Sequence, residues 1–322
     1  MAASSSFGLG REVARGGRFV RQESAFRRWV SADGGSEFPV GAGRYHLYVS
    51  LACPWSHRTV IVRAVKRLEE AVGISYAAPF RDERGWAFSG EPFAEPDGGP
   101  QGEYTDHING FAFLSEAYRA TDPGFEGRVT VPVLWDAKSG QIVSNESADI
   151  VRMLNDVFDP LAGHHVDLYP AALRPEIDRL NELVYDKVNN GVYKAGFARS
   201  QTAYDRAFVE LFAALDELES LLGRRRYLAG DAITEADWRL FPTLARFDAV
   251  YVVHFKCDRR RLVDYPNLWR YAHELYRQPG IAATVAMDQI KRHYYTTHDF
   301  LNPGRIIPGD PAIDFRRPPI AG

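Results

Sequence analysis

The chain has 322 residues, 45% hydrophobic and 13% aromatic, so it can bury one large core or, more readily, two cores of domain size. Its 39 basic and 42 acidic side chains give a net charge of -3, which excludes the broad positive field of a protein that binds nucleic acid or an anionic membrane. Two cysteines are too few for a disulfide framework in a chain of this length, and this usage is typical of a reducing compartment.

Residues 1–43 mix Gly, Arg and Ser with isolated aromatics, which predicts an irregular N-terminal arm. This segment lacks the apolar core of a signal peptide, and no stretch of the chain approaches the ~18 apolar residues of a membrane span. We therefore expect a cytoplasmic protein that has no membrane partner.

An α/β domain is predicted for residues 44–156. Strand composition at 45–50 is followed by a helical segment at 54–73, which has Pro54 in its first turn, and by a second strand at 74–80. Such a β-α-β unit implies two parallel strands joined by a right-handed crossover.

The second half of this domain follows a Gly-, Pro- and Asp-rich stretch at 81–127, which is long for a connection and indicates an insertion or a functional loop. Residues 129–136 and 141–144 then predict an antiparallel hairpin, and Glu146 opens a helix. The complete order predicts a four-stranded mixed sheet.

An all-helical domain is predicted for residues 170–301, and the Pro- and Gly-rich residues 302–322 predict an extended tail. Thr234 and Asp237 have the spacing of a capping box at the start of one helix. The helical periodicities cover 171–190, 202–222, 235–250 and 266–277.

Cys53 stands between a predicted strand and a predicted helix and is followed by Pro54. At a helix N-terminus, the free backbone amides and the positive end of the dipole favour the thiolate form of a cysteine. A lone cysteine is otherwise most often a small buried hydrophobic residue, which is our interpretation of Cys257. Ser56 stands where dithiol oxidoreductases have their second cysteine, so a mixed disulfide on Cys53 would need an external thiol such as glutathione.

Two further features could hold the ends of a peptide-like ligand. A cis bond at Val131-Pro132 would expose the backbone of Val131, although a trans, edge-strand proline is the simpler interpretation. Glu146 could hold an ammonium while Ser147 and the helix amides hold a carboxylate, but both residues are also ordinary helix caps.

Four segments together resemble the cytosolic glutathione transferase fold, and most closely its xi class, the glutathionyl-hydroquinone reductases. The segments are CPWSHR at 53–58, VTVPVLWD at 129–136, SNES at 144–147 and AITEAD at 232–237. The resemblance runs from about residue 20 to the tail and implies a thioredoxin-like domain followed by a helical bundle. The class usually has Ala where Ser56 stands, a change that leaves the need for an external thiol intact.

The resemblance implies that a glutathionyl-hydroquinone and glutathione react to give a hydroquinone and glutathione disulfide. Cys53 would be the nucleophile that takes the glutathionyl sulfur, and a second glutathione would free it. By the same resemblance, glutathione contacts a set of residues in the first domain. They are Trp86, Arg128, Val129, Thr130, Val131, Glu146 and Ser147.

Three tyrosines complete the site that the resemblance implies. Tyr193 would transfer the proton, with Tyr185 as its competitor, while Tyr251 and Tyr294 would stabilise the thiolate of Cys53. The resemblance also implies a homodimer.

We expect neither a bound metal nor a nucleotide cofactor, because the histidine pairs lack ligand spacing and no Gly-rich phosphate loop follows a strand. Three alternative functions stay open. The first is a general thioltransferase or dehydroascorbate reductase of the omega-like type, which would use the same cysteine. The others are a conjugating glutathione transferase and a non-catalytic module of the same fold.

Overall fold

The computed structural model describes residues 12–96 and 99–309, which divide into two units. The sheet unit contains residues 23–167 and 279–297, and the helical unit contains residues 12–22, 168–278 and 298–309. Over the described residues, the chain thus passes from the helical unit to the sheet unit twice and returns to the helical unit each time.

A four-stranded mixed sheet organises the sheet unit, as the sequence predicted. Its strands are β1 (Tyr45–Val49), β2 (Val72–Tyr76), β5 (Val133–Asp136) and β6 (Gln141–Ser144). They lie in the order β2-β1-β5-β6, with β1 and β2 parallel and the other two pairs antiparallel. The thioredoxin-like topology is confirmed.

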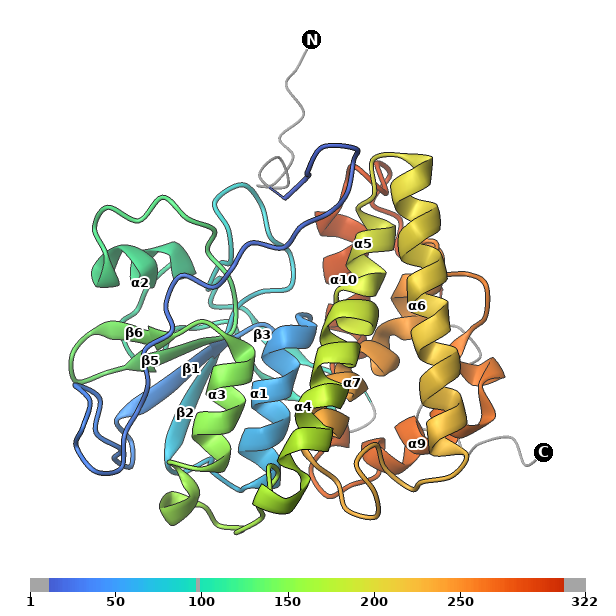
Figure 1. The fold of residues 1–322 in the computed structure, drawn as a ribbon. Helices are drawn as coiled ribbons and strands as arrows, with labels where there is room; N and C mark the ends of the chain where they lie inside the picture. The colour runs from blue at the N-terminus through green and yellow to red at the C-terminus, as the bar shows by residue number, and fades with distance from the viewer. Residues whose placement is uncertain (1–11, 97–98, 310–322) are drawn as a thin grey trace. The chain divides into compact units, whose positions relative to one another are not determined.

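Helices cover both faces of this sheet. The helices α1 (Pro54–Val65) and α3 (Ser147–Asn155) lie side by side on one face (Figure 1). The helix α2 (Leu114–Thr121) contributes Leu114 and Tyr118 to a hydrophobic cluster on the other face, with Tyr48, Val133 and Trp135 of the strands.

The first helix is shorter than the sequence predicted. α1 ends at Val65, because Arg67 adopts a left-handed conformation with φ of 51°, which cannot continue a helix. β2 therefore begins at Val72, where the prediction had the helix continue to residue 73. The hairpin strand β5 also begins late, after Pro132, which has no N–H for a ladder.

The stretch 81–127 holds elements that the sequence analysis did not predict. They are the two-stranded hairpin β3 (Pro92–Ala94) with β4 (Gln101–Glu103), and α2. The start of α2 is stabilised by Glu116, whose carboxylate accepts from the backbone N–H of Phe113 (2.9 Å). The sequence signal was weak because Phe113, at the N-cap, cannot itself accept a hydrogen bond through its side chain.

The segment 279–297 belongs to the sheet unit, whereas the sequence analysis placed it in the helical domain. It contains the 3-10 turn η7 (Ala282–Thr284) and the helix α10 (Met287–Thr297). Glu95 accepts from the backbone N–H groups of Asp288 (2.9 Å) and Gln289 (3.0 Å) at the start of α10. His57 on α1 bonds to Thr284 (2.9 Å), so contacts with residues far earlier in the chain hold this segment.

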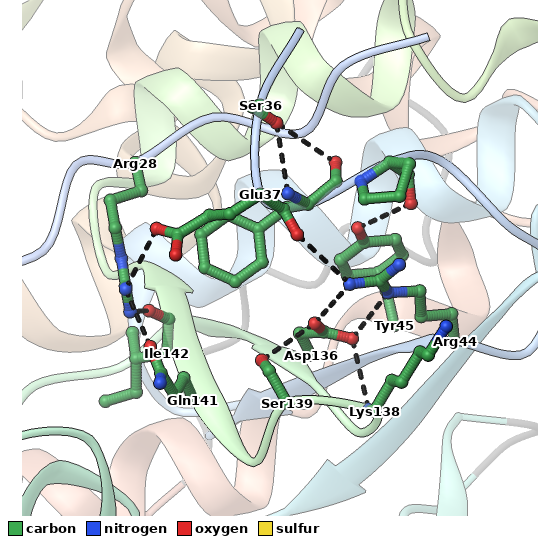
Figure 2. A network of polar contacts seen from close by, with 12 residues as sticks. Arg28, Ser36, Glu37, Arg44, Tyr45, Asp136, Lys138, Ser139, Gln141 and Ile142 are labelled. Atoms are coloured by element: carbon green, nitrogen blue, oxygen red, sulfur yellow. Dashed lines mark hydrogen bonds and ion pairs between the residues drawn. The ribbon is translucent and has the colours of Figure 1, made fainter. Parts of the chain in front are cut away.

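The arm that precedes the sheet forms only isolated bridges in its described part, 12–43, as predicted for an irregular segment. It is fixed to the sheet by side chains (Figure 2). Arg28 donates to Gln141 (2.7 Å) and to the backbone oxygen of Ile142 on β6, and also to Glu37 (3.2 Å). Arm and edge strand are thereby joined by one guanidinium group.

A second arginine acts at the same hairpin end of β5 and β6, where Asp136 pairs with Gln141 (Figure 2). Arg44 binds Asp136 through two hydrogen bonds of 2.7 and 2.6 Å, and Ser139 donates to the same carboxylate (2.8 Å). Burial acts to raise the pKa of Asp136, but these donors outweigh it and lower the pKa below its usual value.

Long helices build the helical unit, as predicted. α4 (Arg174–Leu183), the π-helical segment η4 (Val184–Asn189) and α5 (Gly191–Gly196) follow one another in a nearly continuous rod beside α6 (Gln201–Leu222) (Figure 1). The remaining elements are α7 (Glu235–Arg246), the π-helical segment η5 (Phe247–Tyr251), α8 (Val252–His254) and α9 (Pro266–Tyr276). Besides η7, the described residues contain the 3-10 turns η2 (Asp159–Leu161), η3 (Ala171–Leu173) and η6 (Leu262–Asp264).

The predicted capping box at the start of α7 is present. The N–H of Thr234 donates to the carboxylate of Asp237 (2.7 Å), and the Thr234 side chain caps the first turn in return. Asp237 also accepts from the hydroxyl of Tyr271 (2.7 Å) on α9, so the cap ties two helices together.

An ion-pair cluster on the surface of the helical unit shows a strongly shifted group. Glu176 accepts from Arg179 (3.0 Å) and from Arg225 (2.7 Å). These two guanidinium groups, Arg179 first, lower the pKa of Glu176 to about 2. The tail from residue 310 onward, part of the predicted extended segment, lies outside the described residues.

Candidate active site

Cys53 occupies the N-cap position of α1, as the sequence predicted. Its backbone is extended (φ -80°, ψ 125°) and Pro54 opens the helix directly after it. The residue therefore lies at the positive end of the helix dipole. Its side chain is mostly buried, and its Sγ donates to the backbone oxygen of Val131 at 3.7 Å.

The loop before β5 brings the second predicted element to Cys53. The Val131-Pro132 peptide bond is cis, and Val131 is 5% exposed. Cys53, Trp86 and Val131 share one hydrophobic cluster, and Val129 packs against it from the rim. Three of the predicted glutathione residues are thus gathered around the cysteine within the sheet unit.

Ser56 lies one turn into α1 and is fully buried. Its hydroxyl accepts from the backbone N–H of Ser50 at 3.3 Å, which ties the loop before Cys53 to the helix. A cysteine at this position would be the resolving thiol of a dithiol pair, so the geometry agrees with a single reactive sulfur.

Trp86 is more enclosed than a simple stacking platform would be. Its ring is stacked on His293 of α10, with ring centroids 5.1 Å apart, and the guanidinium of Arg81 lies 5.4 Å from it. Only 4% of the residue is exposed. His293 is itself held by the backbone oxygen of Pro79 at 2.6 Å.

Tyr294 follows His293 on α10 and is 1% exposed. The two rings contact edge to face, with centroids 5.3 Å apart. The unpredicted position of α10 therefore places one of the three predicted tyrosines in the same unit as Cys53 and beside the partner of Trp86.

Glu146 and Ser147 begin α3, as predicted. Glu146 is the N-cap, and its Oε1 accepts from the N–H of Ala148 (3.0 Å), so the interpretation as a helix cap is confirmed. Its Oε2 accepts from the hydroxyl of Ser24 in the arm (2.9 Å). A carboxylate has about four acceptor positions, so capacity for a ligand's ammonium remains.

Asn145 was missed by the sequence analysis, although it lies inside the SNES segment. Its Oδ1 accepts from the N–H of Phe26 (2.9 Å), and its Nδ2 donates to the hydroxyl of Tyr118 (3.0 Å) and to Oγ1 of Thr130 (3.0 Å). The arm, α2 and the loop before β5 meet at this one amide. Only its place next to Glu146 could have drawn attention to it.

Tyr118 was also missed. Its buried hydroxyl donates to the backbone oxygen of Thr130 (2.8 Å) and accepts from the N–H of the same residue (3.1 Å). The backbone of Thr130, a predicted glutathione residue, is thereby fixed from behind. Arg128, two residues earlier, is half-buried.

The helical unit brings two of the predicted tyrosines together. Tyr193 and Tyr251 have ring centroids 6.2 Å apart, and both contact Phe255. Tyr251 ends the π-helical segment η5, and Tyr193 lies one turn after the π-helical segment η4, a type of irregularity that is frequent at functional sites. The competitor Tyr185 is 42% exposed, whereas Tyr193 is 8% exposed.

The arm also reaches Tyr193. The ring of Phe19 contacts that of Tyr193 at 6.4 Å, and the guanidinium of Arg21 lies 4.8 Å from it. Arg21 donates in turn to Asn190 (2.7 Å), next to α5. The arm thus adds an aromatic ring and a cation–π contact to the surroundings of this tyrosine.

The second cysteine is structural. Cys257 is fully buried, and burial raises the pKa of its thiol well above the usual range. Within residues 12–96 and 99–309, no three His, Cys, Asp or Glu side chains are grouped so that they could hold a metal ion. The same part of the chain has no helix long and apolar enough to cross a membrane.

Family models match both units. The model of the glutathione S-transferase N-terminal domain matches residues 52–157, and that of the C-terminal domain matches residues 201–274. The first match includes Cys53 and α3, and the second includes the capping box of α7.

Similar proteins extend the likeness to nearly the whole chain. The glutathionyl-hydroquinone reductase YqjG of Escherichia coli is 50% identical over 310 residues, covering 94% of this chain and 92% of that protein. The glutathionyl-hydroquinone reductase PcpF of Sphingobium chlorophenolicum is 48% identical and covers 92% and 91%. The omega-like glutathione S-transferase 2 of Schizosaccharomyces pombe is 41% identical, covering 92% of this chain and 95% of that protein.

Solved structures show the same fold. The glutathione-bound structure of YqjG from Escherichia coli has a TM-score of 0.85 and covers 91% of this chain and 95% of that one. The xi glutathione S-transferase of Phanerochaete chrysosporium has a TM-score of 0.87 at 45% identity, covering 93% of this chain and 95% of that one.

Proposed function

This chain belongs to the xi class of the glutathione S-transferase family, and on that premise we propose that it reduces S-glutathionyl-hydroquinones to hydroquinones with release of glutathione disulfide. The observation that carries the proposal is a single cysteine at the N-cap of α1, in a chain 50% identical to a glutathionyl-hydroquinone reductase over 94% of its length. The omega-like relatives are less similar, at 41% identity and below. The hydroquinone reductase is therefore favoured over the thioltransferase.

The reaction proceeds in two steps. In the first, the thiolate of Cys53 attacks the glutathionyl sulfur, the bond between sulfur and ring carbon breaks, and the ring carbon takes a proton. The ring is reduced by two electrons, and the two sulfurs form a mixed disulfide. In the second, the thiolate of another glutathione attacks this disulfide, releasing glutathione disulfide and the Cys53 thiolate.

We assign the first proton transfer to Tyr193. Support comes from its burial, from the nearby cation of Arg21, and from its contact with Tyr251 and Phe255. We assign stabilisation of the Cys53 thiolate to the hydroxyls of Tyr251 and Tyr294, because hydroxyl donors favour the charged form of a sulfur.

Glutathione is the co-substrate in this proposal, and no resident cofactor takes part. Its peptide groups lie against the backbone of Val131, and its γ-glutamyl end is held by Glu146 and Ser147, with Trp86 at the edge of the site. Support comes from the hydrophobic cluster that joins Cys53, Trp86 and Val131 and from the glutathione in the E. coli relative's structure. The other proposed contacts are Arg128, Val129 and Thr130.

The test is turnover of a glutathionyl-hydroquinone, followed through both glutathione disulfide and the free hydroquinone. Cys53→Ser is expected to abolish both products, and Tyr193→Phe to lower turnover ~100-fold, the usual size of a proton-transfer contribution. Cys257→Ser is the matched control, because that thiol is buried and plays no part in the chemistry; it should retain wild-type turnover.

The alternatives give different outcomes in the same assay. A wild type that leaves the glutathionyl-hydroquinone intact but reduces dehydroascorbate or small mixed disulfides would be a thioltransferase. A Tyr185→Phe variant that loses as much turnover as Tyr193→Phe would contradict the assignment of the proton-transfer residue.

We also propose that the chain acts in the cytoplasm and as a homodimer. Both of its cysteines are free thiols, as glutathione chemistry in a reducing compartment requires. The homodimer rests on the family resemblance alone, and light scattering of the purified protein would test it.

A further inference from the structure

The arm segment 23–28 pairs with the end of the edge strand β6 through one isolated bridge. The N–H of Arg28 donates to the backbone oxygen of Val143 (3.0 Å), and the N–H of Asn145 donates to that of Phe26 (3.0 Å), on either side of a bridge between Arg27 and Ser144. This pairing fixes the backbone of the segment relative to β6 and to the start of α3.

Side chains of the same segment fix it further. Arg27 binds Asp149 in the first turn of α3 through two hydrogen bonds of 2.8 and 2.9 Å. The ring of Phe26 packs on Tyr118 and Phe125, with centroids 5.7 and 5.6 Å away. The arm is therefore built into the sheet unit at the point where Glu146 lies.

Ser24 lies three residues before the bridge residue Arg27, and its hydroxyl contacts Glu146. Its hydroxyl has one proton and lies 2.9 Å from Oε2 of Glu146 and 3.3 Å from the backbone oxygen of Asn145. The shorter contact, to a charged acceptor, is the stronger hydrogen bond.

The two carboxylate oxygens of Glu146 thus have different partners. Oε1 accepts from the N–H of Ala148 (3.0 Å) and lies 3.5 Å from the hydroxyl of Ser147, whereas Oε2 accepts from Ser24 (2.9 Å). The terminal torsion of a glutamate side chain is intrinsically broad, so contacts to Oε1 alone would leave the plane of the carboxylate poorly defined. The bond from Ser24 to Oε2 defines it.

We propose that Ser24 is a positioning residue of the glutathione site, which orients the Glu146 carboxylate toward the γ-glutamyl ammonium. This inference rests on the proposed role of Glu146 and extends the site to an arm far earlier in the sequence. The arm then contributes to glutathione binding and does not only pair with the edge of the sheet.

The experiment is calorimetric binding of reduced glutathione in a Cys53→Ser background, where no mixed disulfide forms. Adding Ser24→Ala is expected to weaken glutathione binding ~3- to 10-fold. Loss of a direct hydrogen bond to a charged group can weaken binding ~10-fold or more, and Ser24 acts only indirectly, through Glu146. Adding Ser24→Thr, which keeps a hydroxyl, should restore the affinity to within about twofold.

A second ligand separates positioning from a general loosening of the fold. Cysteinylglycine lacks the γ-glutamyl group, so its affinity, measured by competition with glutathione, should be the same before and after Ser24→Ala is added to the Cys53→Ser protein. Ser36→Ala is the matched control, because Ser36 is a half-buried serine of the same arm whose hydroxyl bonds to the backbone of Phe38 (3.3 and 3.1 Å). Loss of the Ser36 hydroxyl should leave the affinities for glutathione and for cysteinylglycine unchanged.

Two results would overturn the inference: unchanged glutathione affinity in Ser24→Ala, or equal weakening of glutathione and cysteinylglycine. A Cys53→Ser protein that binds both thiols equally well would instead overturn the role of Glu146, and this inference with it. Failure of the role of Glu146 is visible before any Ser24 variant is made, so it is distinguishable from failure of the role of Ser24.

Discussion

Replacing Tyr118 by Phe removes one buried hydroxyl and leaves the ring packing of α2 in place. The hydroxyl donates to the backbone oxygen of Thr130 and accepts from the N–H of Thr130 and from Nδ2 of Asn145, at 2.8, 3.1 and 3.0 Å. Thr130 is half-buried, so water can replace part of its bonding, whereas Asn145 is 5% exposed. One amide N–H of Asn145 therefore loses a buried acceptor.

Leaving such a group unsatisfied costs ~1–3 kcal/mol, and the loss at Thr130 adds at most a further ~1 kcal/mol. We expect the free energy of unfolding to fall by about 2 kcal/mol in urea denaturation followed by circular dichroism. Glutathione affinity should fall too, because Thr130 and Asn145 adjoin the proposed site.

Tyr45→Phe is the control for Tyr118→Phe, since it removes a tyrosine hydroxyl from the same unit. That hydroxyl donates to the backbone oxygen of the exposed Pro39 (2.8 Å), where water can replace it. Its loss should cost less than about 1 kcal/mol. The reasoning would be refuted by a Tyr118→Phe protein that is no less stable than Tyr45→Phe, or that lies within about 0.5 kcal/mol of wild type, the low end for one hydrogen bond.

Three further changes test other parts of the fold. Lys66→Met removes a fully buried ammonium that donates to two backbone oxygens and a carboxylate. The free energy of unfolding, measured by urea denaturation, should fall by about 3 kcal/mol, and a variant as stable as wild type would show that this buried cation contributes nothing. Glu176→Gln should destabilise the protein above about pH 5, and the difference from wild type should shrink toward pH 2. The reason is that Arg179 and Arg225 stabilise only the ionised form of Glu176, which is why its pKa is lowered; a difference that grows in acid would contradict this. Gly196→Ala would place a methyl group against the ring of Phe255, which contacts Tyr193. Turnover should fall because Tyr193 is displaced, and the free energy of unfolding should fall by ~1–3 kcal/mol; unchanged turnover would contradict the role of the contact between these two rings.

Local rules were enough for several parts of the fold and of the site. The strand before Cys53, the helix that Pro54 opens and the absence of a second cysteine at Ser56 all follow from neighbouring residues, and they predict a single reactive sulfur at a helix start. The capping box of Thr234 and Asp237 was equally predictable, because it acts over one helical turn.

Local rules were less reliable at the ends of elements and in the insertion. The apolar pattern continued past Val65, but the left-handed backbone of Arg67 ends α1 there. α2 lacks a polar N-cap residue, so its start gave no signal in the sequence.

The sequence by itself determined the cysteine at the start of a helix, the four strands of the main sheet and the family resemblance, because each depends on residues within a few positions of one another. Only the tertiary structure decided that α10 lies with the sheet, that Tyr193 meets Tyr251, and that Ser24 reaches Glu146. These contacts join segments that are far apart in the chain. They depend on how buried surfaces and hydrogen-bonding groups are satisfied across the whole unit, which no local pattern specifies.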